Sequence, residues 1–274
     1  MVLETLFKPK TELIFMKNLI FVKLGGSLIT DKSRPYTARH DVIRRLCKEI
    51  HEARSESDFP LLVGHGGGSF PHVSAQKYET HKGAIRSDSW EGFAKVQDDA
   101  ARLNRIVVAS LMEADENAVS IQPSASCTAR NDRIIGWHMT PIQVALAKGL
   151  IPVPHGDVCV DDVKGCCIIS TEEILKFLAK KLRPERIIMA GKTDGVLGPL
   201  GETIKQIDRK NYAQIIDSLT SSDGVADVTG GMEQKVKMAL GMGCEVEIIN
   251  GLKPGELKRS LLGEWGLGTI INGK

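Results

Sequence analysis

Three glycine clusters in the chain have the composition of phosphate-binding turns. They are Gly25-Gly26-Ser27, Gly66-Gly67-Gly68-Ser69 and Gly230-Gly231. Glycine allows backbone N–H groups to converge on an anion because it has no Cβ, and a helix that follows adds the positive end of its dipole. A single glycine pair is more often a plain tight turn. Three clusters at the ends of predicted elements favour instead a site that holds several phosphate groups.

Two lysines could supply the positive charge that glycine turns lack. Lys23 stands within an apolar run just before the first cluster, and Lys235 follows Gly231 by about one helical turn. Ammonium groups at these places would offset negative charge on a phosphoryl group during its transfer. A lysine inside an apolar strand is rarely a solvated surface residue, which favours a functional Lys23. For Lys235, a solvated position on a helix remains an equal alternative.

The common nucleotide-binding fingerprints do not fit the sequence. The P-loop pattern fails at residues 26–33, where Asp31 replaces the second glycine, and again before Lys192-Thr193, where Arg186 replaces the first. The dinucleotide pattern fails at residues 65–70 because the third glycine is missing. The sequence therefore argues against a P-loop and against NAD binding.

Alternating strand and helix patterns position these clusters. Short apolar runs predict buried strands at Asn18–Leu24, Leu61–Val63, Ile187–Met189 and Val246–Ile249. Helical spacing of apolar residues predicts helices at Asp41–Ala53, Ser89–Ala114, Tyr212–Leu219 and Gly231–Gly241. The Ser89 helix would bury Trp90, Phe93 and Val96, and a capping box begins a further helix at Ser170. The alternation predicts an α/β fold with a mainly parallel central sheet and helices on both faces.

The composition is that of an ordinary globular chain. A hydrophobic fraction of 42% and a charged fraction of 26% exclude collagen-like, low-complexity and disordered classes. The net charge of +2 is too small to attract nucleic acid or an acidic membrane over a broad face. The six cysteines form no CxxC pair, so neither a zinc ribbon nor a disulfide scaffold is indicated. A cytoplasmic location is therefore predicted.

The first residues are predicted to be a short extension, residues 1–16. They lack the cationic start and uninterrupted apolar core of a signal peptide, and Met16 could itself begin translation. Lys17 and Lys23 interrupt the most apolar stretch, so no membrane span is predicted.

Four motifs give the chain a resemblance to a known family. They are Lys23–Lys32 (KLGGSLITDK), His65–His72 (HGGGSFPH), His155–Val158 (HGDV) and Asp227–Met232 (DVTGGM). Together they resemble the amino acid kinase superfamily and, within it, the isopentenyl phosphate kinases, over residues 17 to 274. The SFxH ending at His72 is the mark of that subfamily, and fosfomycin kinase is a close relative.

The resemblance implies an αβα sandwich with two lobes on one continuous sheet. Residues 17–180 would form the N-terminal lobe, which binds the acceptor isopentenyl phosphate, and residues 181–274 the C-terminal lobe, which binds the nucleotide. The implied reaction is direct in-line phosphoryl transfer from ATP, which brings Mg²⁺ with it, to isopentenyl phosphate. Similar kinases are commonly homodimers. No dedicated metal cage is predicted, because no cluster of His, Cys and carboxylate residues is seen in the sequence.

The resemblance also implies roles for particular residues. Lys23 and Lys235 would contact the transferring phosphoryl group, and with His72 they are the predicted catalytic residues. The predicted ATP-binding residues are Lys23, Gly25, Gly26, Ser27, Lys32, Gly68, Asp194, Gly231 and Lys235. The predicted acceptor-binding residues are Gly67, His72 and Gly156.

A histidine suits the acceptor side for a physical reason. A phosphate monoester has its second pKa at about 6, so its attacking oxygen already lacks a proton at neutral pH and needs no general base. A hydrogen-bond donor such as His72 would partly offset the repulsion between two phosphates. For His65 and His155, a structural role is the favoured interpretation.

The chain departs from the family pattern at three places. Pro71 replaces a glycine, Thr171-Glu172-Glu173 replaces Gly-Asp-Asp, and residues 191–195 (GKTDG) replace a Thr-Asp-x-Asp-Gly turn. Two alternatives to the implied reaction follow: a kinase for a phosphonate or an acidic amino acid, and a nucleotide-sensing module without turnover.

Overall fold

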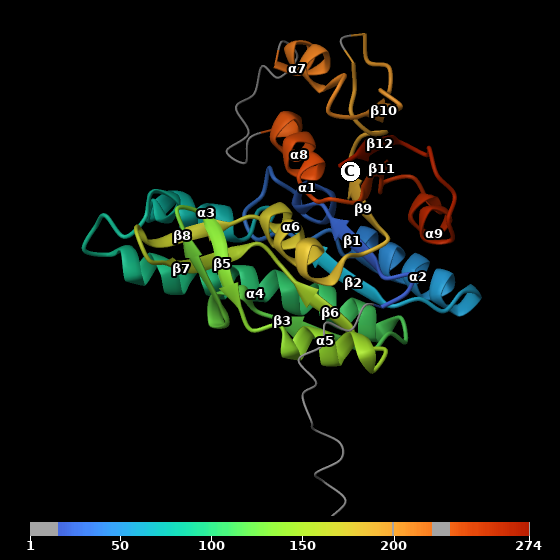
Figure 1. Ribbon diagram of the computed structural model, residues 1–274. Coiled ribbons are helices and arrows are strands. Elements are labelled where there is room, and N and C mark those ends of the chain that lie inside the picture. Colours follow the sequence, from blue (N-terminus) through green and yellow to red (C-terminus); the bar gives the residue numbers. More distant parts are fainter. Residues whose placement is uncertain (1–15, 199, 221–230, 274) are drawn as a thin grey trace, which may run out of the picture.

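A six-stranded sheet lies at the centre of the protein (Figure 1). The computed structural model describes residues 16–198, 200–220 and 231–273, so the predicted extension lies almost entirely outside the described residues. The strands run in the order β10-β12-β11-β9-β1-β2, and every neighbouring pair is parallel except β11 with β12. Their bounds are β1 Ile20–Leu24, β2 Leu61–His65, β9 Arg186–Gly191, β10 Gln206–Ile207, β11 Glu245–Asn250 and β12 Thr269–Asn272.

Two further parallel strands continue beside β2. Strand β3 (Ala118–Ile121) pairs with β6 (Ile151–Pro154). An isolated parallel bridge between His65 and His155 joins the end of β2 to the residue that follows β6. The carboxyl ends of β1, β2, β6 and β9 therefore lie at one edge, which is where parallel α/β sheets place their ligands.

A separate four-stranded sheet was not predicted from the sequence. It has the order β5-β4-β7-β8 and is mostly antiparallel. Its strands are β4 Cys127–Arg130, β5 Arg133–Trp137, β7 Asp157–Asp161 and β8 Gly165–Ile169. Figure 1 shows it beside α4 and α6, at the end of the molecule away from α9. The predicted α/β architecture is confirmed for the central sheet, and this second sheet is an addition to it.

Helices cover both faces of the central sheet. Their bounds are α1 Gly26–Ile29, α2 His40–Glu56, α3 Pro71–Lys77, α4 Ser89–Glu113, α5 Thr140–Ala147, α6 Thr171–Leu182, α7 Tyr212–Thr220, α8 Gly231–Leu240 and α9 Glu256–Leu261. Side chains of β1 alternate between the two faces, as the period of a strand requires. Val22 packs with residues of α2, α4 and α9, whereas Phe21 packs with residues of α6 and α8.

Local sequence signals set the helix ends. The side chain of Ser170 accepts a hydrogen bond from the backbone N–H of Glu173 (3.2 Å), which confirms that α6 begins with an N-cap. Arg183 adopts a left-handed conformation with φ of 50° and ends α6 before Pro184. The expectation that Trp90 packs inward is wrong: the residue is 55% exposed because it lies on the solvent side of the first turn of α4, where Ser89 and Gly92 take the buried positions.

None of the helices in the described part of the chain combines the length and the apolar character that crossing a membrane demands.

Candidate functional site

The alternation of β1 decides where Lys23 lies. Lys23 follows Phe21 by two residues, so both side chains share the face covered by α6 and α8. Only 6% of Lys23 is exposed. Its Nζ lies 2.5 Å from Oε1 of Glu172, in the first turn of α6. The ammonium group is therefore held in place at the end of the central strand by a buried ion pair.

Glu172 connects the two lysines that the sequence singles out. Burial opposes the charged form of its carboxylate, but the ammonium groups of Lys23 and Lys235 and its own backbone N–H hold its pKa below the usual value. Lys235 acts on Glu172 from α8, which packs against α6. Glu172 is thus paired with Lys23 and also feels the charge of Lys235. Glu172 was not among the predicted site residues, although it lies in one of the three segments that depart from the family pattern.

The first two glycine clusters approach each other so closely that side chains are excluded. A Cβ added to Gly26 would lie 2.5 Å from the backbone nitrogen of Gly68, and one added to Gly66 would lie 2.8 Å from the nitrogen of Gly26. Gly68 also has a φ of +57°, a region that glycine adopts at no steric cost. These glycines bring the turn after β1 against the turn after β2.

Thr30 fixes the two turns in register. Its hydroxyl donates to the carbonyl oxygen of Gly26 (2.7 Å) and accepts from the backbone N–H of Ser69 (3.0 Å). Gly25 donates its N–H to the carbonyl oxygen of Ala190 (2.9 Å), which ties the first turn to the end of β9 as well. Three strand ends are therefore joined by short backbone contacts at this edge of the sheet.

The predicted acceptor side begins at Gly67. A Cβ on Gly67 would lie 2.4 Å from Cγ of Pro71, so the proline ring packs directly on the glycine loop. Pro71 is the first residue of α3, where its fixed φ is favourable. His72 follows in the first turn of α3 and is partly buried. The substitution at Pro71 therefore starts the helix that carries His72.

Gly156 lies where β6 meets the end of β2. Its N–H donates to the carbonyl oxygen of His65 (3.1 Å), and the hydroxyl of Thr171 donates to the same oxygen (2.7 Å). A Cβ on Gly156 would lie 3.2 Å from the Thr171 hydroxyl. Gly156 in the turn after β6, His65 at the end of β2 and Thr171 at the start of α6 consequently meet at one carbonyl group.

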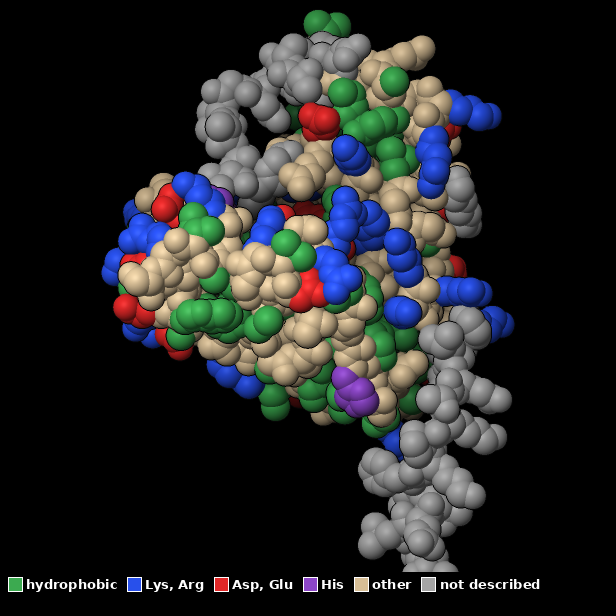
Figure 2. Space-filling view, turned by 60° about the vertical axis from the view of Figure 1, so that its left-hand side comes forward, with side chains coloured by type: hydrophobic (Ala, Val, Ile, Leu, Met, Phe, Trp, Pro, Cys, Tyr) green, Lys and Arg blue, Asp and Glu red, His purple; other side chains and the backbone are tan. Residues whose placement is uncertain are grey.

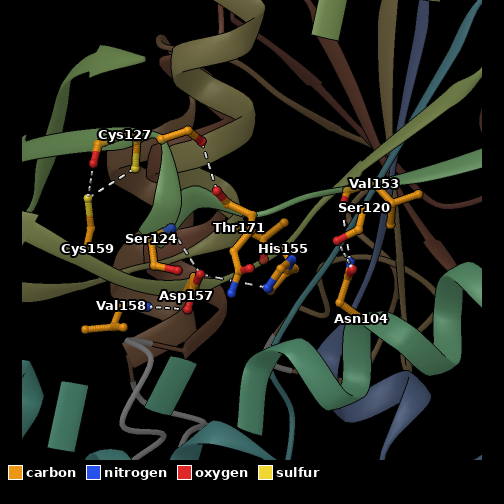
Figure 3. A network of polar contacts seen from close by, with 12 residues as sticks. Asn104, Ser120, Ser124, Cys127, Val153, His155, Asp157, Val158, Cys159 and Thr171 are labelled. Carbon is orange, nitrogen blue, oxygen red and sulfur yellow. Dashed lines mark hydrogen bonds and ion pairs between the residues drawn. The ribbon is translucent and has the colours of Figure 1, made fainter. Parts of the chain in front are cut away.

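Two histidines are buried below this meeting point. The rings of His65 and His155 stack with centroids 5.4 Å apart, and Asn104 Nδ2 lies 3.1 Å from Nε2 of His65. Figure 3 shows Asn104 and His155 among the buried polar residues. Burial lowers the pKa of His65 to about 4 and that of His155 well below its ordinary value. Burial also raises the pKa of Asp157 to about 6. Both rings are therefore buried and neutral, which agrees with the structural role predicted for these two histidines.

Asp194 lies after β9, on the side of the sheet edge away from Gly156. Its carboxylate accepts from Asn250 Nδ2 (2.7 Å) and pairs with Lys253 Nζ (2.7 Å). The hydrogen bonds from Lys253 and Asn250 lower its pKa.

The remaining predicted nucleotide residues lie on two elements. Ser27 is in the first turn of α1, and Lys32 is exposed in the turn that follows α1. Gly231 is the first residue of α8, with a φ of +61°. The rest of the third glycine cluster and its motif, residues 227–230, lie outside the described residues.

One group of metal-ligand type occurs among the described residues, away from the glycine turns. It consists of Asp132, Asp161 and Cys167. Asp161 accepts from the backbone N–H groups of Asp132, Val163 and Lys164, and these bonds outweigh burial and lower its pKa to about 2. Lys164 pairs with Asp132. The oxygens are thus engaged within the protein.

The molecular surface is hollowed on one side. Figure 2 shows this hollow between the part that carries α8 above and the part that carries α6 below, with Lys and Arg side chains gathered at its rim. An anionic ligand would find positive charge on its path inward.

Glycine turns at the carboxyl ends of parallel strands, with lysines beside them, define a class of phosphate-handling α/β proteins. The chain belongs to the amino acid kinase family, whose model matches residues 18–250. The predicted fold family and the predicted enzyme class, a phosphotransferase, are confirmed at this level.

Particular relatives narrow the comparison. The chain is 37% identical to an isopentenyl phosphate kinase of Methanocaldococcus jannaschii, covering 90% of this chain and 96% of the relative. It is 35% identical to an isopentenyl phosphate kinase of Methanothermobacter thermautotrophicus, covering 93% and 100%. A solved isopentenyl phosphate kinase structure superposes with a TM-score of 0.79 at 31% identity, covering 93% of this chain and all of the other.

Proposed function

We propose that the protein transfers the γ-phosphoryl group of ATP to the phosphate of isopentenyl phosphate, giving isopentenyl diphosphate and ADP. The observation that carries the proposal is the buried Lys23–Glu172 pair at the end of β1, together with the closely packed glycine turns that follow β1 and β2. The similarity to isopentenyl phosphate kinases over more than nine-tenths of the chain supports the choice of acceptor.

Transfer proceeds in line, without a phosphorylated enzyme. An oxygen of the acceptor phosphate attacks the γ-phosphorus, the new P–O bond forms, and the bond to the β-phosphate oxygen breaks with its electron pair leaving on ADP. The attacking oxygen is already deprotonated above a pH of about 6, so the site requires no base. What the protein must supply is positioning and positive charge.

Lys23 and Lys235 supply that charge in this proposal. Glu172 holds the Lys23 ammonium at the strand end, so little reorganisation is needed as negative charge develops on the γ-phosphoryl oxygens. The N–H groups of Gly26, Ser27, Gly68 and Gly231 line the nucleotide phosphates, and Gly25 holds the first of these turns in place through its hydrogen bond to Ala190. Lys32 and Asp194 complete the predicted nucleotide side.

The acceptor phosphate binds on the other side of the glycine loop. Gly67 offers its backbone N–H group to the acceptor, and His72 donates a side-chain hydrogen bond from the first turn of α3. Gly156 lines the acceptor side, where its own N–H is bonded to the His65 carbonyl oxygen.

Magnesium enters with the nucleotide. The described carboxylates beside the glycine turns, Glu172 and Asp194, are both paired with ammonium groups. ATP phosphates and water would accordingly be the main ligands of Mg²⁺, as its preference for oxygen ligands allows, and the bound ion would neutralise part of the phosphate charge.

A coupled ADP-release assay tests the proposed function, with the diphosphate product identified by phosphorus NMR. Isopentenyl phosphate is expected to give the highest kcat/KM in a panel that also contains fosfomycin and N-acetylglutamate. Preference for either of those acceptors would replace the substrate assignment. ATP binding without ADP release for any acceptor would favour a nucleotide sensor.

His72 is tested in the same assay. His72→Ala removes the donor and is expected to raise the acceptor KM by about tenfold or more, the equivalent of one charge-assisted hydrogen bond. The KM for ATP should stay within about twofold because His72 lies on the acceptor side. His81→Ala removes an exposed histidine as the matched control. An unchanged acceptor KM in His72→Ala would remove His72 from the site.

We also propose a homodimer in the cytoplasm. The small sheet exposes Ile135 (51%) and Val160 (44%), apolar side chains that a second copy could cover. The six cysteines are all free and buried, as expected in a reducing compartment. Sedimentation velocity measures the mass in solution, and a monomer at micromolar concentration would contradict the dimer.

A further inference from the structure

Thr171 occupies a position that none of the predicted roles covers. It is the first residue of α6 and is only 2% exposed. Its hydroxyl donates to the carbonyl oxygen of His65, the last residue of β2, and Glu172 follows it directly. Figure 3 shows Thr171 within the buried polar network that includes His155 and Asp157. Thr171 therefore contacts His65, which leads into the glycine loop, and directly precedes Glu172, the ion-pair partner of Lys23.

The neighbouring glycine makes room for this contact. Gly64 of β2 pairs in register with Lys23 of β1. A Cβ on Gly64 would lie 3.1 Å from the methyl carbon of Thr171. Strand β2 thus has no side chain where the start of α6 rests on it, and both groups of Thr171, methyl and hydroxyl, lie against backbone.

The His65 carbonyl oxygen serves two elements at once. It accepts from the Thr171 hydroxyl at 2.7 Å and from the Gly156 N–H at 3.1 Å. Gly156 belongs to the proposed acceptor side. The start of α6, the glycine loop and the turn after β6 are consequently held by one pair of hydrogen bonds.

We propose that Thr171 is a positioning residue, whose hydroxyl sets the distance between the acceptor-binding turns and the Glu172–Lys23 pair. This inference rests on the proposed function, and it assigns Thr171 no contact with substrate. Without the hydroxyl, the first turn of α6 can move relative to the His65 carbonyl, and Glu172 and the Lys23 ammonium move with it. Transfer is sensitive to such movement, since a displacement of about 1 Å can cost about a hundredfold in rate.

Steady-state kinetics of two substitutions test the role. Thr171→Val keeps the shape and removes the hydroxyl, whereas Thr171→Ser keeps the hydroxyl. We expect Thr171→Val to lower kcat by about tenfold or more with a KM for ATP within about twofold. Thr171→Ser should recover most of the loss. Ser260→Ala is the stability control, because it removes another buried hydroxyl, which bonds Glu247, from α9, an element that contributes nothing to the proposed site.

Amide hydrogen exchange tests the contact independently of activity. In Thr171→Val, the Gly156 amide should exchange about tenfold faster than in the wild-type chain, because its acceptor carbonyl is less well fixed. Thr171→Ser and Ser260→Ala should leave this exchange within about twofold.

The two measurements separate the failure of this inference from failure of the proposed function. If the wild-type chain does not phosphorylate isopentenyl phosphate, the proposed function fails and the exchange of Gly156 alone decides about Thr171. Unchanged exchange in Thr171→Val overturns the positioning role in every case. Wild-type kinetics in Thr171→Val, or an equal loss in Thr171→Ser, overturns it as well.

Discussion

The substitution Glu172→Gln removes one charge from the buried pair and leaves Lys23 in place. Gln has the shape of Glu, so the packing of α6 on the sheet should be preserved. The Lys23 ammonium, only 6% exposed, would then lack its anionic partner. We expect the variant to lose stability in the absence of nucleotide and to lose activity.

The magnitude follows from the burial of the pair. Removing one member of a buried ion pair costs about 3–5 kcal/mol because the other charge stays desolvated. The Glu172 side chain is 14% exposed, which favours the lower end of that range. The amide oxygen of Gln can still accept a hydrogen bond from Lys23, and this bond reduces the loss of stability by about 1 kcal/mol. The expected loss in the free energy of unfolding is therefore about 2–3 kcal/mol.

Urea denaturation with and without MgATP measures this loss. If Lys23 faces the nucleotide phosphates, ATP supplies the missing negative charge and stabilises Glu172→Gln more than it stabilises the wild-type chain. The difference in the free energy of unfolding between Glu172→Gln and the wild-type chain should therefore be smaller at saturating ATP. The kcat of the variant should fall by about tenfold to a hundredfold, since the ammonium is less well oriented.

Glu173→Gln is the matched control for Glu172→Gln. It removes the same charge from the same turn of α6, while the Glu173 contact to Ser170 is made by the backbone N–H and persists. It should lose less than about 0.5 kcal/mol. A loss below about 1 kcal/mol in Glu172→Gln, or a loss that ATP does not reduce, would refute the reasoning about the buried pair.

Three further substitutions test the surroundings of the site. Gly26→Ala places a methyl group 2.5 Å from the backbone nitrogen of Gly68, so we expect a loss of about 1–3 kcal/mol in urea denaturation and a higher KM for ATP; wild-type values would contradict the contact. Asn104→Ala removes the partner of His65 Nε2 and should cost about 3 kcal/mol by the same method, whereas a loss under about 1 kcal/mol would show that the network is replaceable. Burial raises the pKa of Asp157 from 3.8 to about 6, so its folded form gains stability from a proton at low pH and loses that stability as the pH rises through 6. Relative to Asp157→Asn, the free energy of unfolding of the wild-type chain should therefore fall by up to about 3 kcal/mol between pH 4 and 6. A difference between the two proteins that does not change with pH would refute the raised pKa.

Local patterns were sufficient to predict most elements of the central sheet. The apolar spacing after Ser89 predicted a helix that ends one residue from the end of α4, because side chains three and four apart share a face. The apolar run before Gly25 predicted β1, which contains a single lysine. The alternation of side chains along a strand then explains why this lysine is buried on the face covered by α6 and α8.

Contacts between distant residues could not be predicted in the same way. Glu172 is 149 residues from Lys23, and no periodic pattern connects them. The four-stranded sheet is built from runs of four or five residues, such as Cys127–Arg130, whose alternation is too short to stand out from a loop. Its register comes from pairing with β7, about 30 residues further on.

The central place of β1 has a consequence for synthesis of the chain. One neighbour of β1 is β2, but the other is β9, whose residues begin at Arg186. At about 5–20 residues per second, a ribosome needs roughly 10–30 seconds to pass from one strand to the other. During that time one edge of β1, a fully buried strand, has no permanent neighbour, and a nascent chain that stalls before Arg186 would leave this edge open to aggregation or to a chaperone.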